Sequence, residues 1–214
     1  MRLTVNEIFF SIQGESTHAG RPCAFIRLTG CNLRCDYCDT AYAYDEGTPQ
    51  SISDILKKIS AFPVRLVEIT GGEPLLQPET PQLIRQLLDA GYEVMLETNG
   101  SLDISSVDPR CIRIVDMKCP SSGESSKNLV SNLSHLTPRD QVKFVIGTPE
   151  DYNYAAALLP SIPERVPRHH ILFSPVSGKI SLALLAEWIL RDHLPVRLHF
   201  QLHKLIWPEA DRGC

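Results

Sequence analysis

Short runs of apolar residues recur along the chain, and each run is followed by a polar or glycine-containing segment. The runs are rich in Val, Ile and Leu, which is typical of strands in a parallel sheet that is covered by helices. We expect strands over Cys23–Gly30, Val64–Thr70, Tyr92–Gly100, Cys111–Lys118, Gln141–Gly147, His170–Pro175 and Val196–His203.

Between several of these runs the apolar residues recur at helical spacing instead. In Ser51–Phe62 the residues Ile52, Ile55, Leu56 and Ile59 share one helical face, and serines near the start can cap the helix. Further helices are expected over Glu79–Gly91, which Gly91 ends, and over Asp151–Pro160 and Ser181–Asp192.

Strand and helix therefore alternate, which predicts an α/β fold with a parallel sheet. About six parallel strands are too few for an eight-stranded barrel, so we expect a partial, open TIM-type barrel with reduced helices. No linker divides the 214 residues, which indicates a single domain over 1–214. Such folds place their active sites after the strands, here at Gly30–Thr40, Gly71–Pro74, Thr98–Gly100, Lys118–Gly123 and Ser174–Gly178. The stretch from Lys118 to Leu129 has no periodicity and is expected to be a long functional loop.

Charge and hydropathy exclude two classes of partner. The net charge is −4 and the basic residues are scattered, so nucleic-acid binding is not expected. No apolar run approaches the roughly 20 residues that span a bilayer, so no membrane partner is expected. The N-terminal segment lacks the plan of a signal peptide, which indicates a cytoplasmic protein.

Three of the seven cysteines lie together in "GCNLRCDYCDT", as Cys31, Cys35 and Cys38. In a reducing compartment such a cluster indicates metal binding. A structural zinc site needs a fourth ligand, for which Cys23 and His18 are candidates. Alternatively, three thiolates hold three irons of a [4Fe–4S] cluster. The fourth iron is then open to the amino and carboxylate groups of S-adenosylmethionine (SAM).

The spacing C-x3-C-x-aromatic-C, followed by "ITGGEPLLQ" at Ile69–Gln77, resembles the radical SAM superfamily. Within that superfamily the chain resembles the 7-carboxy-7-deazaguanine synthase family over most of its length. The likeness rests on the segments Glu7–Thr40, "ETNG" at Glu97–Gly100, Asp116–Lys118 and "QLHK" at Gln201–Lys204.

This resemblance implies a lyase that converts 6-carboxy-5,6,7,8-tetrahydropterin into 7-carboxy-7-deazaguanine with loss of ammonia, using SAM catalytically, in queuosine or deazapurine biosynthesis. Arg27 suits a substrate carboxylate, and Glu15 could assist the loss of ammonia. No side chain stands out as a strong general base. The implied substrate residues are Ile12, Gln13, Gly14, Glu15, Arg27, Thr70 and His203. Two structural interpretations stay open: an ion pair between Glu15 and Arg27, and a core position for His203.

The resemblance also implies the cofactor sites. Cys31, Cys35 and Cys38 would bind the [4Fe–4S] cluster, and Thr40 would be the one protein ligand of a Mg²⁺ ion, unless it only caps a helix. SAM would be bound by Tyr37, Asp39, Gly71, Gly72, Glu73, Asp116, Met117, Lys118, Ser174, Pro175, Val176 and Ser177. At Asp116–Lys118 and Ser174–Ser177 the sequence departs from the usual family pattern, so backbone contacts are expected there.

The implied partners are a small-molecule pterin, a flavodoxin-like or other low-potential electron donor, and a second copy of the chain in a homodimer. Two alternatives remain at this level. One is an activating enzyme for a glycyl-radical protein, and the other is a non-catalytic zinc or iron–sulfur module. Gln13, Glu15 and Arg27 favour a small anionic substrate over a protein loop.

Overall fold

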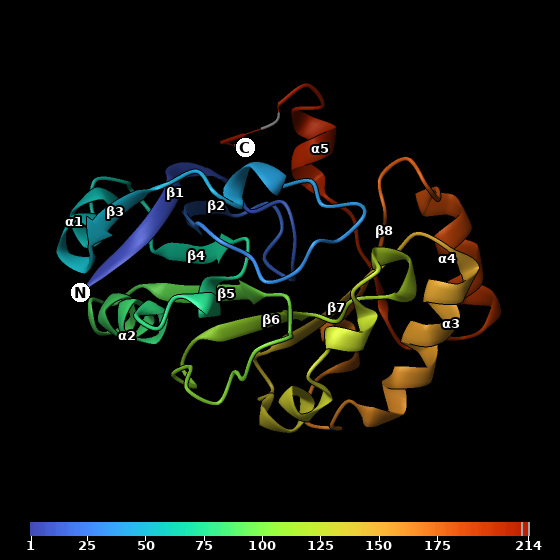
Figure 1. The fold of residues 1–214 in the computed structure, drawn as a ribbon. Helices are drawn as coiled ribbons and strands as arrows, with labels where there is room; N and C mark the ends of the chain where they lie inside the picture. The colour runs from blue at the N-terminus through green and yellow to red at the C-terminus, as the bar shows by residue number, and fades with distance from the viewer. Residues whose placement is uncertain (211, 214) are drawn as a thin grey trace.

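The computed structural model describes residues 1–210 and 212–213, which form a nine-stranded sheet in the order β3-β1-β2-β4-β5-β6-β7-β8-β9 (Figure 1). The strands are β1 (Arg2–Ile12), β2 (Pro22–Leu28), β3 (Thr48–Ser51), β4 (Leu66–Gly71), β5 (Glu93–Thr98), β6 (Ile112–Asp116), β7 (Gln141–Ile146), β8 (Ile171–Pro175) and β9 (Arg197–Leu198). The α-helices are α1 (Ile52–Ile59), α2 (Thr80–Asp89), α3 (Pro149–Leu158), α4 (Leu182–Arg191) and α5 (Leu202–Ile206).

The described strands β2 and β4 to β9 pair parallel to one another. At the other edge of the sheet, β1 pairs antiparallel with both β2 and β3. Its strand order is open, so the expected partial barrel is confirmed. In Figure 1, α1 and α2 lie beside the early strands, and α3 and α4 lie beside β7 and β8. The parallel strands therefore end at one shared rim.

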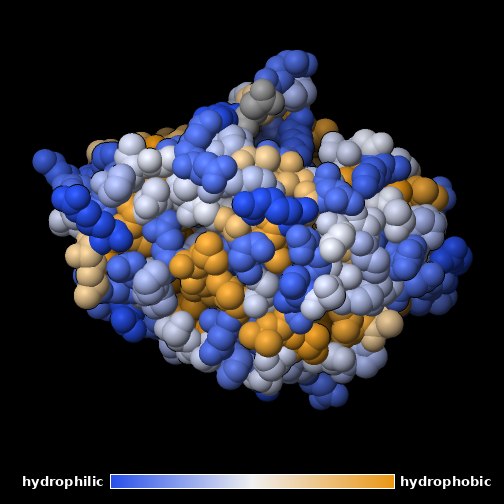
Figure 2. All heavy atoms as spheres, in the orientation of Figure 1, coloured by the Kyte–Doolittle hydropathy of each residue, from blue (hydrophilic) through white to orange (hydrophobic). Residues whose placement is uncertain are grey.

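Apolar side chains fill three regions. One cluster lies between α1, α2 and the early strands, and a second lies between α3, α4 and the later strands. A third, smaller cluster lies on the opposite face of the sheet and includes Phe25, Met95 and Ile114. On the face shown in Figure 2, hydrophobic side chains form separate patches among hydrophilic ones.

The helix boundaries follow from local chemistry. The Ser51 hydroxyl accepts a hydrogen bond from the Asp54 backbone N–H at 3.1 Å and caps α1, as the sequence predicts. After α2, Gly91 takes a φ of +83°, which glycine adopts without steric cost. None of the described helices combines the length and hydrophobicity needed to cross a bilayer.

Several parts of the chain differ from the sequence-based expectation, and β1 and β3 are strands that the apolar pattern does not predict. The predicted strand Val196–His203 is wrong beyond its first part, because only Arg197 and Leu198 pair with β8 and His203 lies in α5. β9 is an edge strand, and after it the chain crosses the rim, where the Leu202 N–H donates to the Gly14 carbonyl at 2.8 Å. The stretch after Lys118 contains short 3₁₀ turns at Pro120–Ser122 and Ser125–Lys127.

The capping box of α3 allows a direct test of one boundary. Thr148 Oγ1 accepts from the Asp151 N–H at 3.1 Å, and the Asp151 carboxylate accepts from the Thr148 N–H at 3.0 Å. Thr148→Ala should lower the free energy of unfolding by about 1 kcal/mol, measured by chemical denaturation. Thr148→Ser keeps the hydroxyl and should stay close to the native value. Equal losses in both variants would contradict the cap.

Candidate active site

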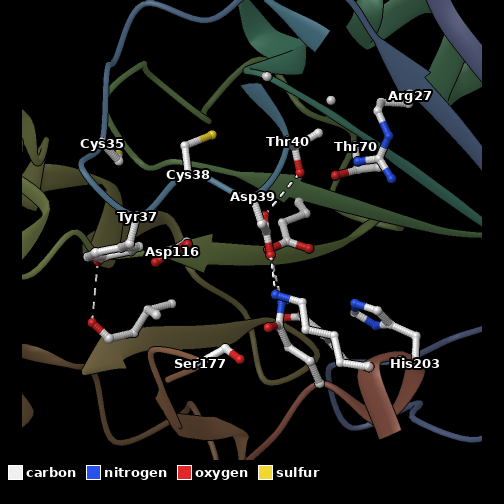
Figure 3. A pocket seen from close by; sticks show the side chains of 18 of the residues that line it. Arg27, Cys35, Tyr37, Cys38, Asp39, Thr40, Thr70, Asp116, Ser177 and His203 are labelled. Carbon is white, nitrogen blue, oxygen red and sulfur yellow. Dashed lines mark hydrogen bonds and ion pairs between the residues drawn. The ribbon is translucent and has the colours of Figure 1, made fainter. Parts of the chain in front are cut away.

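A cavity of about 1210 Å³ lies at the carboxyl ends of the parallel strands. Its walls come from the cysteine loop after β2, the glycine turn after β4, the ends of β5 to β8 and the C-terminal segment. In Figure 3 the labelled side chains surround this space, with Cys35 and Tyr37 on one side and Arg27 and His203 on the other. Every site residue expected from the sequence lines the cavity except Glu73 and Met117.

The cysteine loop is packed directly against the glycine turn. The Glu73 N–H donates to the Gly30 carbonyl at 2.7 Å. A Cβ on Gly72 would lie 2.2 Å from that same carbonyl oxygen and 2.7 Å from the Cβ of Cys31. A Cβ on Gly71 would lie 2.2 Å from the Leu28 carbonyl oxygen. Both glycines are therefore needed for this close approach of two backbones.

The Glu73 side chain links neighbouring backbone segments by hydrogen bonds and does not line the cavity. It is fully buried, and its carboxylate accepts from the Leu75 N–H, the Thr98 hydroxyl and the Asn99 N–H at 2.7–2.9 Å. Burial raises the pKa of Glu73, and these hydrogen bonds oppose the shift. Met117 is also fully buried. Neither side chain is therefore placed to contact a ligand in the cavity.

The three clustered thiols share the cavity wall. Cys31 and Cys35 are half-buried and Cys38 is exposed. Burial raises the pKa of Cys31 and of Cys35, and the neighbouring thiols add to the shift at Cys35. Within residues 1–210 and 212–213, no three His, Cys, Asp or Glu side chains are gathered closely enough to hold one metal ion. A [4Fe–4S] cluster does not require its cysteines to converge on one metal ion, because each cysteine binds a different iron.

Neither candidate for closing a zinc site lines the cavity. Cys23 is fully buried, and its thiol is directed at the Ala24 carbonyl at 3.5 Å. His18 contacts Glu93 at 3.3 Å instead. The geometry therefore supports three protein thiols with an open fourth position, as in the cluster interpretation.

On the side of the cavity next to β6, buried polar groups are available to a ligand. Asp116 Oδ2 accepts from Lys118 Nζ at 2.8 Å, while its buried Oδ1 has no hydrogen-bond partner among the residues that the structure describes. A buried oxygen without a hydrogen bond costs free energy unless a ligand or a water molecule donates one to it. Tyr37 lies nearby, with its hydroxyl 3.4 Å from the Val145 carbonyl and Lys179 Nζ 5.5 Å from its ring centre. These residues and the glycine turn fit an amino-acid cofactor such as SAM.

Arg27 lies at the opposite end of the cavity, next to Thr70 (Figure 3). Its Nε donates to Glu7 at 2.7 Å, and the rings of Phe9 and Tyr42 lie 5.8 and 5.7 Å from its guanidinium carbon. The possible ion pair between Arg27 and Glu15 is therefore wrong, since each has another partner. An arginine held through Nε keeps its two terminal nitrogens for a carboxylate.

Carboxyl groups line the inner part of the cavity. Glu15 Oε2 accepts from Lys143 at 2.8 Å and Oε1 accepts from Gln201 at 2.8 Å. Burial alone would raise the pKa of Glu15, but Lys143 holds it below its usual range. Burial and the charge of Glu97 raise the pKa of Glu68 to about 8. The side-chain amide of Gln13 has two partners: its Nε2 donates to the Glu68 carboxyl group, and its Oε1 accepts from the Glu15 backbone N–H.

Sequence reasoning missed Glu68 and Lys143 as members of this site. Each is a charged residue inside an otherwise apolar strand, in "LVEIT" and "QVKFVI". Such a residue is rarely buried unless it is paired or neutral. That pattern is the signal that could have found them.

The C-terminal segment covers the cavity at its rim. His203 is half-buried and lines the cavity, so its interpretation as a core histidine is wrong. A Cβ on Gly14 would lie 2.0 Å from its Nδ1, so Gly14 permits this close packing. Asp39 accepts from Lys204 at 2.7 Å and from the Thr40 hydroxyl at 3.1 Å. Thr40 precedes a short 3₁₀ helix without capping it through its side chain.

Comparison with known proteins agrees with this fold and site. The model of the radical SAM superfamily matches residues 25–116, which include the cysteine loop and the glycine turn. The fold and this match identify the chain as a radical SAM enzyme.

Similar proteins with known names indicate which family of radical SAM enzymes the chain belongs to. The chain is 45% identical to a 7-carboxy-7-deazaguanine synthase of Chlorobaculum tepidum, over 99% of this chain and 97% of the relative. It is 39% identical to one of Koribacter versatilis, over 99% of this chain and all of that relative. The crystal structure of QueE from Escherichia coli matches with a TM-score of 0.81 at 26% identity, covering 95% of each chain. The chain belongs to the 7-carboxy-7-deazaguanine synthase family.

The raised pKa of Glu68 predicts how stability depends on pH. The native protein binds the proton more tightly than the unfolded chain, so this group's contribution to the free energy of unfolding falls as pH rises from about 4.5 to about 8. Glu68→Gln keeps the shape and removes this titration. Relative to the native protein, the free energy of unfolding of this variant should rise by roughly 3 kcal/mol between pH 5 and pH 8, measured by denaturant titration.

Glu164→Gln, at an exposed glutamate, is the control variant. A Glu68→Gln curve that runs parallel to the native curve over this pH range would contradict a protonated Glu68.

Proposed function

We propose that this protein converts 6-carboxy-5,6,7,8-tetrahydropterin into 7-carboxy-7-deazaguanine with loss of ammonia, in queuosine or deazapurine biosynthesis. One observation carries the proposal: a single cavity joins the three-cysteine loop to a pocket that Arg27 lines together with the carboxyl groups of its inner part. The substrate has the complementary pattern, with a carboxylate at one end and an amino-pyrimidinone edge at the other. Membership of the family supports the same reaction.

In this proposal Cys31, Cys35 and Cys38 hold the [4Fe–4S] cluster, and SAM lies along Gly71, Gly72 and the strand end at Asp116. When bound, these groups supply a 5′-deoxyadenosyl radical for hydrogen abstraction. Gly72 lets the SAM site lie directly beside the cysteine loop, and the free Asp116 Oδ1 supports an N–H or O–H contact from the ligand. Tyr37 and the Ser174–Ser177 loop border the same space.

The substrate would be oriented by charge. Arg27, held through Nε by Glu7, would bind the substrate carboxylate with its terminal nitrogens. Glu15 would accept hydrogen bonds from the amino-pyrimidinone edge. Because its pKa is held below the usual range, Glu15 is a weak proton acceptor, which favours this binding role over a role in ammonia loss.

Three further elements belong to the proposal. Thr40 would give one hydroxyl ligand to a Mg²⁺ ion, which commonly takes its other ligands from water and substrate. The exposed position of Cys38 supports delivery of an electron by a flavodoxin-like or other low-potential donor. A homodimer is the proposed assembly.

The test is product analysis of the anaerobically reconstituted protein with the carboxy-pterin, SAM and a reductant. The expected result is 7-carboxy-7-deazaguanine, with ammonia in equal amount and SAM unconsumed over many turnovers. Stoichiometric cleavage of SAM without any deazaguanine would contradict the proposal.

A substitution of Arg27 tests the binding of the substrate carboxylate directly. Arg27→Gln removes a charge-assisted contact with the substrate carboxylate and should raise the KM for the pterin roughly ten- to a hundredfold. The KM for SAM should stay near the native value. Arg21→Gln is the matched control, because Arg21 pairs with Glu93 at 2.7 Å outside the cavity. An Arg27→Gln enzyme with the native KM for the pterin would contradict the assignment of Arg27 to the substrate carboxylate.

A further inference from the structure

Lys143 is a buried cation that the proposed function does not use. It lies on β7 directly opposite Asp116 of β6, and its side chain is 6% exposed. It lines the same cavity as the substrate and cofactor residues. A lysine is almost never buried in this way unless it is paired.

The partners of Lys143 come from separate parts of the rim. Its ammonium donates to Glu15 Oε2 at 2.8 Å and to Glu97, and it lies 3.9 Å from Asp116 Oδ2. Glu15 follows β1, while Glu97 lies near the end of β5. One ammonium therefore fixes two carboxylates that are far apart in the sequence and face one pocket.

Without this cation the two carboxylates would repel each other in a poorly solvated place, and one would take up a proton. Burial alone would raise the pKa of Glu15, yet the pKa lies below its usual range because of Lys143. Glu97 differs, because burial raises its pKa although it accepts from the same ammonium. Glu68 lines the same cavity, accepts from no lysine among the described residues, and has a pKa raised to about 8.

The chemistry of a pterin edge gives this arrangement a use. The 2-amino group and the neighbouring ring N–H are adjacent donors, and an ionised carboxylate can accept from both. A protonated carboxyl group would present a donor where an acceptor is needed. The ionisation state of these carboxyl groups therefore decides whether the edge can bind.

We propose that Lys143 is a positioning residue of this site: it holds Glu15 as a hydrogen-bond acceptor for the amino-pyrimidinone edge of the substrate, and Glu97 braces the same ammonium. The choice of ligand rests on the proposed function. Lys143 acts through Glu15 and does not touch the reacting atoms. Other titratable groups interact with this cluster from neighbouring elements, namely Asp39, Glu68, Asp116, His199 and His203.

The test compares Lys143→Met and Lys143→Arg in the reconstituted protein. The probe is pterin-6-carboxylate, an oxidised and fluorescent analogue, with SAM binding followed separately by the cluster spectrum. Lys143→Met should weaken pterin binding about a hundredfold near pH 6, and the affinity should recover as rising pH ionises the carboxyl groups. Lys143→Arg should stay within about tenfold of the native protein, and SAM affinity should change much less than pterin affinity in both variants.

Arg113→Met is the matched control. Arg113 and Asp140 form another buried ion pair, 2.6 Å apart and outside the cavity, so its loss should reduce stability without changing the pH profile of pterin binding. A Lys143→Met protein with native pterin affinity and native pH profile would overturn the proposal. An equal loss of SAM and pterin binding would also overturn it, because that would indicate general damage.

If Lys143→Met does not fold, the double variant Lys143→Met/Glu97→Gln removes one positive and one negative charge together. It should still bind the pterin weakly with the same recovery at high pH, because Glu15 again lacks its cation. Native affinity in the double variant would contradict the proposal. Failure of the proposed function is seen separately, since the native protein would then bind pterin-6-carboxylate poorly or form no deazaguanine.

Discussion

The contact between the glycine turn and the cysteine loop is the constraint on which the site depends. The Glu73 N–H reaches the Gly30 carbonyl at 2.7 Å, and no Cβ can be accommodated at Gly72 between them. The carboxylate of Glu73 then ties this turn to Thr98 and Asn99 at the end of β5. A loop of three thiols is thereby held against the ends of two strands, beside the cavity where substrate must bind.

Charge then divides the cavity into regions. Arg27 lies at one end, Asp116 and Lys118 lie at another, and Glu15, Glu68 and Lys143 lie deeper. Burying this many ionisable groups is costly, because each loses hydration that its partners only partly replace. The apolar clusters around α1 to α4 supply the stability that offsets this cost. The polar interior is therefore best understood as a requirement of binding, not of folding.

Much of this arrangement follows from the sequence alone. The parallel strands from β2 to β8, the helices between them and the cysteine loop all leave local signals, namely apolar runs, helical periodicity and close cysteine spacing. β1 and β3 were not foreseen, and Val196–His203 was expected to be a strand throughout. Its apolar alternation is real, but the strand lies at the edge of the sheet, where pairing ends after two residues.

The pairings inside the cavity could not be foreseen, because they join residues that are distant in sequence. Glu15 pairs with Lys143, and Arg27 pairs with Glu7 across two antiparallel strands. Likewise, nothing local separates Glu73, which turns inward to bind backbone groups, from a residue that faces a ligand. The residue types of the site can therefore be inferred from sequence, while their partners and ionisation need the fold.

The most direct test of the account is a crystal structure of the reconstituted protein with SAM and pterin-6-carboxylate bound. The pterin carboxylate is expected at Arg27, its amino-pyrimidinone edge at Glu15, and SAM between the cysteine loop and Asp116. A pterin bound in the reverse orientation, or outside the cavity shared with the cysteine loop, would contradict it.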